Sequence, residues 1–267
     1  MIKDITLGQY FPGNFVIHRL DPRTKIIWLI LSIVALFTAK GPLGYILAAV
    51  VAVLFIAVST VSVKTILSGL KPLIIIIVLT GLLNMFYTSG TVLVEFWIIK
   101  ITREGIINAA YMVSRIIMLI TATFMLTYTT SPLSLTDGLE RLLSFLKRFK
   151  VPIHELSMMM SIALRFIPTL IEETGKIMNA QKARGADFDT GGLVKKAKAM
   201  IPLLVPLFIS AFKRADELAV AMESRCYHGG EGRTRMRVLR MRAADWVVIA
   251  LSIMLCVASW LLRGVTL

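Results

Sequence analysis

The sequence predicts an all-α integral membrane protein with about five transmembrane helices and three cytoplasmic helices. Of its 267 residues, 57% are hydrophobic and 17% are charged, below the ~25% charge of an average soluble domain. The mean hydropathy is +0.77. Apolar runs close to the ~20 residues that cross a bilayer recur along the chain. These runs occupy residues 25–39, 43–62, 72–88, 106–130 and 245–262.

The order of these runs divides the chain into three parts. Residues 1–130 hold a turn-rich lead-in and four runs, residues 131–243 form a basic helical region, and residues 244–267 hold the last run. The first run is short, and we expect Arg23–Lys25 to extend it by reaching the membrane surface. The first residues do not follow the pattern of a signal peptide, so we expect no cleavage.

The distribution of basic residues predicts the orientation. With the N-terminus inside and five spans, 25 of the 30 lysines and arginines lie inside, and Arg115 lies within a span. The four outside are Lys40, Lys100, Arg103 and Arg263. Because basic residues collect on the cytoplasmic side, the N-terminus and residues 131–243 are predicted to be cytoplasmic. The same rule accounts for the net charge of +14 without a nucleic-acid partner.

Residues 131–243 are predicted to form an amphipathic helix at 135–149 and two longer helices at 153–184 and 192–225. The longer helices each contain an apolar stretch, but the basic residues between these stretches argue against spans. We therefore expect two long helices at the cytoplasmic face that contact the membrane or a partner along their apolar sides. At 1.5 Å per residue, a 32-residue helix reaches ~48 Å.

Both long helices are predicted to end at an arginine between small residues. The two triplets are Ala183-Arg184-Gly185 and Ser224-Arg225-Cys226. A guanidinium group stays charged and offers a rigid fork of donors, which suits docking into a partner. The spacing alone leaves open an ordinary C-terminal helix cap, which the helix dipole also favours.

The sequence contains no recognisable catalytic or cofactor site. Cys226 and Cys256 lie in different surroundings and predict neither a disulfide nor a metal site. The three histidines are scattered, and there is no phosphate-binding loop, nucleophile elbow or zinc-protease motif. The arginines at 233–242 favour a topology anchor and contact with anionic lipid over RNA binding, because interleaved aromatic residues are missing.

Two further features leave alternatives open. Arg115 is the one charge firmly within a predicted span, so it faces either a substrate or partner helix, or a packing contact near Asn108 or Ser114. The run Met158–Met160 is either an adaptable partner surface or ordinary helix packing, since methionine side chains repack easily.

Several motifs, in order along the chain, resemble the transmembrane T component of energy-coupling factor (ECF) transporters. Each motif alone is weak, but together they span essentially the whole chain. They are Gly8–Gly13, His18–Lys25, Ile101–Gly105, Thr130–Leu133 and the two arginine triplets. The second triplet departs from the commoner Ala-Arg-Gly form but keeps its arginine.

The resemblance implies a non-catalytic subunit in the plasma membrane of a prokaryote. It implies that ATP and Mg²⁺ are bound by two cytoplasmic ATPase subunits, and that a small membrane subunit captures a vitamin or other micronutrient. Arg184 and Arg225 would each enter a groove on one ATPase. The long helices would transmit ATPase movements to the capture subunit.

Other function classes fit the sequence less well. A conventional ABC importer permease lines its own substrate path. Ile201-Pro202-Leu203 weakly resembles the coupling loop of that class, but two helices that end at an arginine fit it poorly. A lipid-modifying enzyme needs acidic or nucleophilic residues grouped at the membrane face. An ion-driven carrier needs a carboxylate at mid-membrane depth, whereas Glu95 and Glu104 are predicted in a loop.

Overall fold

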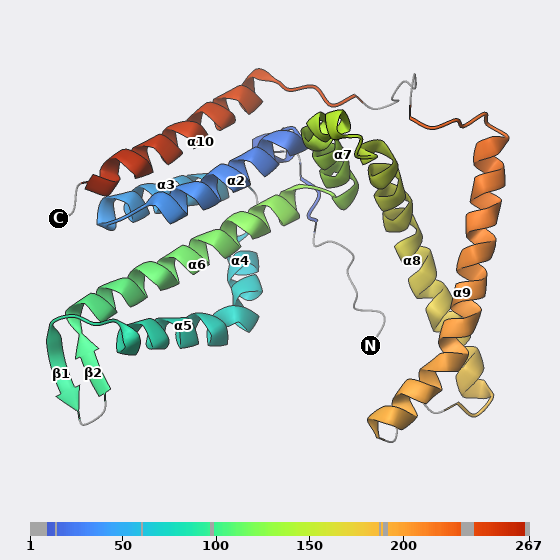
Figure 1. Ribbon diagram of the computed structural model, residues 1–267, viewed down its shortest axis with the longest axis horizontal. Coiled ribbons are helices and arrows are strands. Elements are labelled where there is room, and N and C mark those ends of the chain that lie inside the picture. Colours follow the sequence, from blue (N-terminus) through green and yellow to red (C-terminus); the bar gives the residue numbers. More distant parts are fainter. Residues whose placement is uncertain are drawn as a thin grey trace. The chain divides into compact units, whose positions relative to one another are not determined.

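The computed structural model describes residues 10–13, 15–59, 61–96, 99–186, 188, 192–230 and 238–264. The chain forms two compact units. The membrane unit combines Gly8–Arg141 with Leu239–Leu267, and the helix-pair unit consists of Leu142–Val238. Figure 1 shows the helices and strands of the chain with their labels.

The membrane unit is built from helices and one short hairpin. Its first elements are α1 (Val16–Arg19), α2 (Pro22–Thr38), α3 (Pro42–Val58), α4 (Val63–Leu70), the 3₁₀ turn η1 (Lys71–Leu73) and α5 (Ile74–Tyr87). There follow β1 (Val92–Phe96), β2 (Ile99–Thr102), α6 (Arg103–Thr129), α7 (Pro132–Leu142), α10 (Ala243–Leu261) and η3 (Leu262–Gly264). The helix α7 ends at the boundary between the units.

The membrane class and the all-α class are confirmed. Three helices in the described chain are long and apolar enough to cross a bilayer: Val63–Tyr87, Arg103–Thr129 and Ala243–Leu261. The apolar helix α3 is shorter, at 17 residues, as is α2. The long helices 153–183 and 193–223 are not among these candidate spans. The count of five spans stays a prediction, as do the part boundaries after residues 130 and 243.

The hairpin is one departure from the sequence expectation. Glu95, predicted in a loop, lies in β1, which pairs antiparallel with β2. Glu104, also predicted in a loop, lies in the first turn of α6. The side chain of Thr102 accepts a hydrogen bond from Gly105 N–H at 3.0 Å, which caps α6 where the hairpin ends.

Aromatic and aliphatic side chains form the core of the membrane unit. The Trp28 and Phe55 rings stack at 3.9 Å between α2 and α3. Met125 and Tyr128, near the end of α6, are each 1% exposed. The outer faces of the helices expose apolar side chains, such as Val53 at 62% and Met254 at 65%. Exposed apolar side chains over several helices suit a lipid environment, since soluble monomers rarely carry large apolar patches.

Arg115 is a packing residue that ties three helices of the membrane unit together. Its guanidinium on α6 donates a hydrogen bond to the Tyr45 hydroxyl of α3. It also lies 5.3 Å from the centre of the Phe37 ring on α2. Of the two alternatives, these contacts favour packing, with Tyr45 and Phe37 as the partners rather than Asn108 or Ser114. An aromatic face and a hydroxyl can stabilise a charge at this depth.

A polar junction holds the first turns of α2 and α10 together. The Asp245 carboxylate, 1% exposed, accepts hydrogen bonds from Asp21 N–H at 2.8 Å and Arg242 N–H at 2.7 Å. The Arg23 guanidinium pairs with the Asp21 carboxylate at 2.9 Å and also donates to Leu239 O at 3.3 Å. Although burial acts to raise the pKa of Asp21, hydrogen bonds from Arg23 hold that pKa below its usual value.

The helix-pair unit contains η2 (Leu143–Phe149), α8 (Ile153–Ala183) and α9 (Leu193–Glu223). The two long helices agree with their predicted bounds to within two residues. The expectation of one helix at 135–149 was wrong. The helix α7 begins earlier, because Pro132 fits the first helical position and Ser131 Oγ accepts Ser134 N–H at 3.3 Å. After Leu142 the chain tightens into the 3₁₀ turn η2.

The helices α8 and α9 run antiparallel and cross (Figure 1). Near the loop between them, Gln181 Nε2 donates to Pro202 O at 3.4 Å. Further along, the Glu173 carboxylate of α8 accepts hydrogen bonds from Ser210 Oγ and the Arg214 guanidinium of α9. These polar contacts fix the register of the two helices against each other.

Candidate docking site at two helix ends

Arg184 ends α8 in a Schellman motif, a common way to stop a helix. The N–H of Gly185 donates to Lys182 O at 3.0 Å, and the N–H of Ala186 donates to Gln181 O at 3.0 Å. This pattern puts Arg184 at the C-cap and Gly185 at the next position, which takes a left-handed conformation. Gly185 has a φ of +87°, which glycine adopts without steric cost.

Arg225 ends α9 with the same hydrogen bonds. The N–H of Cys226 donates to Glu223 O at 2.9 Å, and the N–H of Tyr227 donates to Met222 O at 3.1 Å. Cys226 therefore takes the place that Gly185 holds in the first triplet, with a φ of +55°. The two triplets, which differ in sequence, give one backbone geometry with an arginine at the same position.

Both arginine side chains are exposed, and so are the other residues of the two triplets: Ala183, Gly185, Ser224 and Cys226. Within the described chain, neither guanidinium forms a hydrogen bond or an ion pair. The donors of both forks are thus available to an acceptor beyond the described residues. A carboxylate is the acceptor that matches the fork in shape and charge.

The antiparallel packing separates the two arginines. Arg184 lies close to Gln181, whose side chain contacts Pro202 near the start of α9. From Pro202 to Arg225 the chain advances about 35 Å along α9, at 1.5 Å per residue. Two arginines this far apart suit two separate acceptor sites better than one.

An apolar stripe runs along α9 between the arginines. Its exposed side chains are Met200, Ile201, Leu204, Val205, Phe208, Ile209 and Phe212. On α8, Met159 and Met160 are also exposed, at 54% and 49%. Since methionine side chains repack easily, these exposures favour an adaptable surface for membrane or partner over internal packing.

Within the residues that the structure describes, no group of three histidine, cysteine or carboxylate side chains is placed to hold a metal ion. Cys226 and Cys256 are free thiols. The two exposed arginines offer charge and shape for binding a partner.

The sequence reasoning located both arginines but missed the conformation of Cys226. A cysteine carries no signal for a left-handed residue, whereas the glycine of the first triplet does. The left-handed conformation of Cys226 is revealed by the matching hydrogen bonds of the two helix ends, which are visible only in the three-dimensional structure. The contact of Glu173 with Ser210 and Arg214 was also missed, because its members lie 37 and 41 residues apart.

We expect Cys226→Gly to stabilise the end of α9 by about 1 kcal/mol, because it removes the cost of a left-handed conformation in a residue with a side chain. Gly185→Ala is expected to destabilise the end of α8 by a similar amount. No atom lies within 4 Å of a Cβ added at Gly185, so backbone strain alone would act there. Hydrogen exchange of the last-turn amides measures both changes. Unchanged protection in both variants would contradict the assignment.

Comparisons with known proteins agree along nearly the whole chain. Residues 13–236 match the model of the CbiQ family, described as cobalt transport protein. The chain is 55% identical over 262 residues to the energy-coupling factor transporter transmembrane protein EcfT of Thermosediminibacter oceani, covering 98% of this chain and 99% of the relative. It is 51% identical to the proteins of the same name from Ruminiclostridium cellulolyticum and Clostridium kluyveri, with at least 95% of each chain covered.

Proposed function

Because this chain belongs to the EcfT family of energy-coupling factor transporter transmembrane proteins, we propose that it couples ATP hydrolysis on two cytoplasmic ATPase subunits to uptake by a third, membrane-embedded subunit. In this proposal the chain itself binds no nucleotide and catalyses no reaction. ATP and Mg²⁺ belong to the ATPases. The third subunit is small and binds a vitamin or another micronutrient.

The observation that carries the proposal is the pair of exposed arginines in the same helix-end geometry. Arg184 and Arg225 each offer a guanidinium fork without a partner in the described chain. Lysine would serve the helix dipole equally well, so an ordinary cap does not account for two arginines. Docking into a carboxylate-lined groove on each ATPase accounts for both the residue type and the repeated geometry.

The helix-pair unit is built so that displacement of one helix is transmitted to the other. Glu173 binds both Ser210 and Arg214 across the crossing of α8 and α9, so a push on one helix end is transmitted to the other helix. Movement of the ATPases at Arg184 or Arg225 would thus displace the whole pair.

The apolar stripe of α9 is the proposed contact for the substrate-binding membrane subunit. Phe208, Ile209 and Phe212 are each more than 60% exposed. A stripe of this kind left in water would be costly, so membrane or protein covers it. A contact that relies on apolar surface rather than on specific polar pairs could also accept more than one such subunit.

We place the N-terminus and residues 131–243 in the cytoplasm of a prokaryotic cell, because 25 of the 30 basic residues then lie inside. A cysteine introduced at Gly191 is expected to resist a membrane-impermeant thiol reagent in intact cells and to react after permeabilisation. The background variant lacks the native thiols at Cys226 and Cys256. Reaction in intact cells would contradict this orientation.

Purification in mild detergent tests the assembly. We expect the tagged chain to elute with two ATPase subunits and one small membrane protein, in a complex that hydrolyses ATP. The identity of the small subunit would give the substrate class. A complex with the ATPases alone that still transports substrate would instead support a permease that lines its own path.

A further inference from the structure

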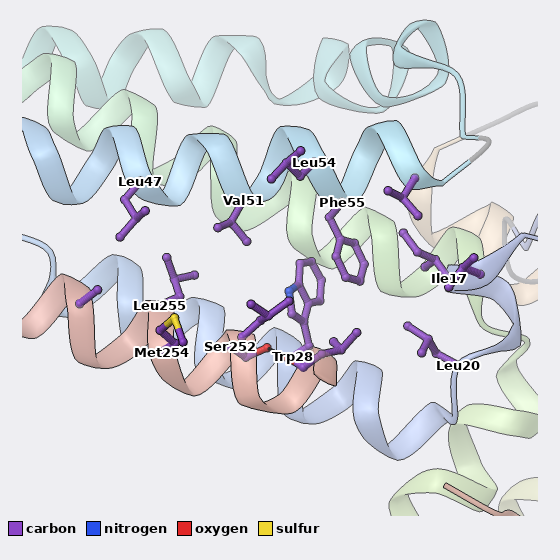
Figure 2. Close-up of a pocket in the computed structure, with 15 residues that line it drawn as sticks. Ile17, Leu20, Trp28, Leu47, Val51, Leu54, Phe55, Ser252, Met254 and Leu255 are labelled. Carbon is purple, nitrogen blue, oxygen red and sulfur yellow. Dashed lines mark hydrogen bonds between the residues drawn. The ribbon is translucent and has the colours of Figure 1, made fainter. Parts of the chain in front are cut away.

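The membrane unit contains a narrow apolar groove that the docking function does not use. It has a volume of about 430 Å³ and lies between α2, α3 and α10, with α1 at one end (Figure 2). Ser252 is the one residue with a polar side chain in its lining apart from the indole of Trp28. The Ser252 hydroxyl donates to Val248 O of its own helix at 2.6 Å, so it has no need of a ligand.

The composition of the lining excludes water as a stable occupant. A buried water requires two to four polar partners. The labelled side chains that point into the groove are almost all aliphatic or aromatic, among them Leu47, Val51 and Leu255 (Figure 2). Hydrocarbon is the chemistry that fits such walls.

The length of the groove matches one leaflet of a bilayer. On α10 the lining runs from Val248 to Ala258, about 15 Å at 1.5 Å per residue. The hydrocarbon core of a bilayer is ~30 Å thick, so one leaflet supplies ~15 Å. A chain seated along the groove would therefore belong to a single leaflet.

The groove is long and open enough for an extended hydrocarbon chain. Its volume of about 430 Å³ extends along the ~15 Å between Val248 and Ala258. A chain lying there would contact the apolar side chains of α3 on one side and of α10 on the other.

Exposed basic residues belong to the segments at the α1 end of the groove. Ile17 and Leu20 line that end, and Arg19 between them is exposed. The first turn of α10 follows Arg242, whose side chain is also exposed, and Trp246 there is 63% exposed, as expected of an aromatic residue at a membrane interface. Basic side chains at the membrane surface attract anionic headgroups.

We infer that this groove is a binding site for one anionic phospholipid, with an acyl chain between α3 and α10 and its headgroup beside Arg19 and Arg242. The lipid comes from the leaflet on the side of α1. The site goes beyond the proposed coupling function and does not depend on it. An occupied groove would fill the space between two helices that otherwise pack on each other only in part.

Trp28 supplies a direct readout, because it lines the groove and is only 4% exposed. The full-length chain is prepared with Trp97, Trp246 and Trp260 replaced by phenylalanine, so that Trp28 alone fluoresces. It is reconstituted into vesicles of phosphatidylcholine that contain increasing amounts of phosphatidylglycerol with brominated acyl chains. We expect strong quenching of Trp28 at low mole fraction, and much weaker quenching when the brominated chains are on phosphatidylcholine.

Two pairs of matched variants assign the site. Val51→Phe fills the groove and is expected to suppress the quenching, whereas Val50→Phe places the same ring on the exposed face of the same helix and should leave it unchanged. Arg19→Gln is expected to weaken the preference for phosphatidylglycerol about fivefold, the worth of one basic side chain at a membrane surface. Lys40→Gln, an exposed basic residue beyond the far end of α2, should have no effect.

The results that overturn the inference are distinct. Equal quenching by the two brominated lipids, unchanged by Val51→Phe, would show that Trp28 senses bulk lipid and that the groove selects none. No quenching by either lipid would show that the groove is closed to acyl chains. If Val51→Phe fails to fold, the comparison of Arg19→Gln with Lys40→Gln still tests whether the site prefers an anionic lipid. Both variants should fold, since neither Arg19 nor Lys40 packs in the core.

Discussion

In the Arg184→Glu/Arg225→Glu double variant, we expect both ATPase subunits to be lost from the complex purified in mild detergent. Each substitution replaces a guanidinium fork by a carboxylate that faces the carboxylate of its proposed acceptor. Breaking one buried, hydrogen-bonded charge pair at an interface costs about 2–5 kcal/mol. Two such losses would lower the affinity of this chain for the pair of ATPase subunits by several orders of magnitude. Uptake should then fall to background.

The single variants and a charge-matched control sharpen this test. Because the two arginines are exposed on different helices, each single variant should lose its own ATPase contact and still fold. Arg184→Lys keeps the charge but loses the bidentate geometry, so partial binding is expected. Lys176→Glu reverses an exposed charge on the same helix and should leave assembly intact. Wild-type co-purification and transport in the double variant would refute the docking role.

The second large effect concerns Asp245, which we expect to contribute about 3 kcal/mol to the stability of the membrane unit through its buried hydrogen bonds. In Asp245→Ala, the N–H groups of Asp21 and Arg242 lose their acceptor, and α10 loses its first-turn carboxylate. Asp245→Asn keeps one acceptor oxygen and should lose about half as much. Denaturant-induced unfolding of the purified chain in mixed micelles, followed by tryptophan fluorescence, measures both changes.

Asp216→Ala is the matched control for Asp245→Ala, because Asp216 is an exposed aspartate of α9. Its removal should change the free energy of unfolding by less than about 0.5 kcal/mol, as is usual for surface positions. If Asp245→Ala and Asp216→Ala unfold at the same denaturant concentration, the polar junction does not stabilise the unit.

Hydrophobic runs and helix-end chemistry predicted most of the helices from the sequence. The apolar run at 106–130 corresponds to α6, Arg103–Thr129. The helix begins earlier than the run because the side chain of Thr102 caps it. The two long helices of the helix-pair unit were found because small residues and basic groups mark their ends. Local signals of this kind act over a few residues, which is the range that sequence patterns describe.

Features that depend on residues far apart in the sequence were not predictable in the same way. The bond from Arg115 to Tyr45 joins residues 70 positions apart, and neither residue carries a signal for the other. The left-handed Cys226 was missed because its backbone conformation follows from how α9 ends rather than from the residue itself. The apolar groove is likewise assembled from four helices, each of which shows only ordinary hydrophobic periodicity.

The junction at Asp245 has a consequence for the order in which the protein matures. Its carboxylate reaches the backbone of Asp21, 224 residues earlier in the chain. While the ribosome is still making the intervening helices, the first turn of α2 has no such acceptor, and the groove beside Trp28 lacks one wall. The polar junction and the groove of the membrane unit are therefore completed only when α10 packs beside α2, which is among the first helices to be made.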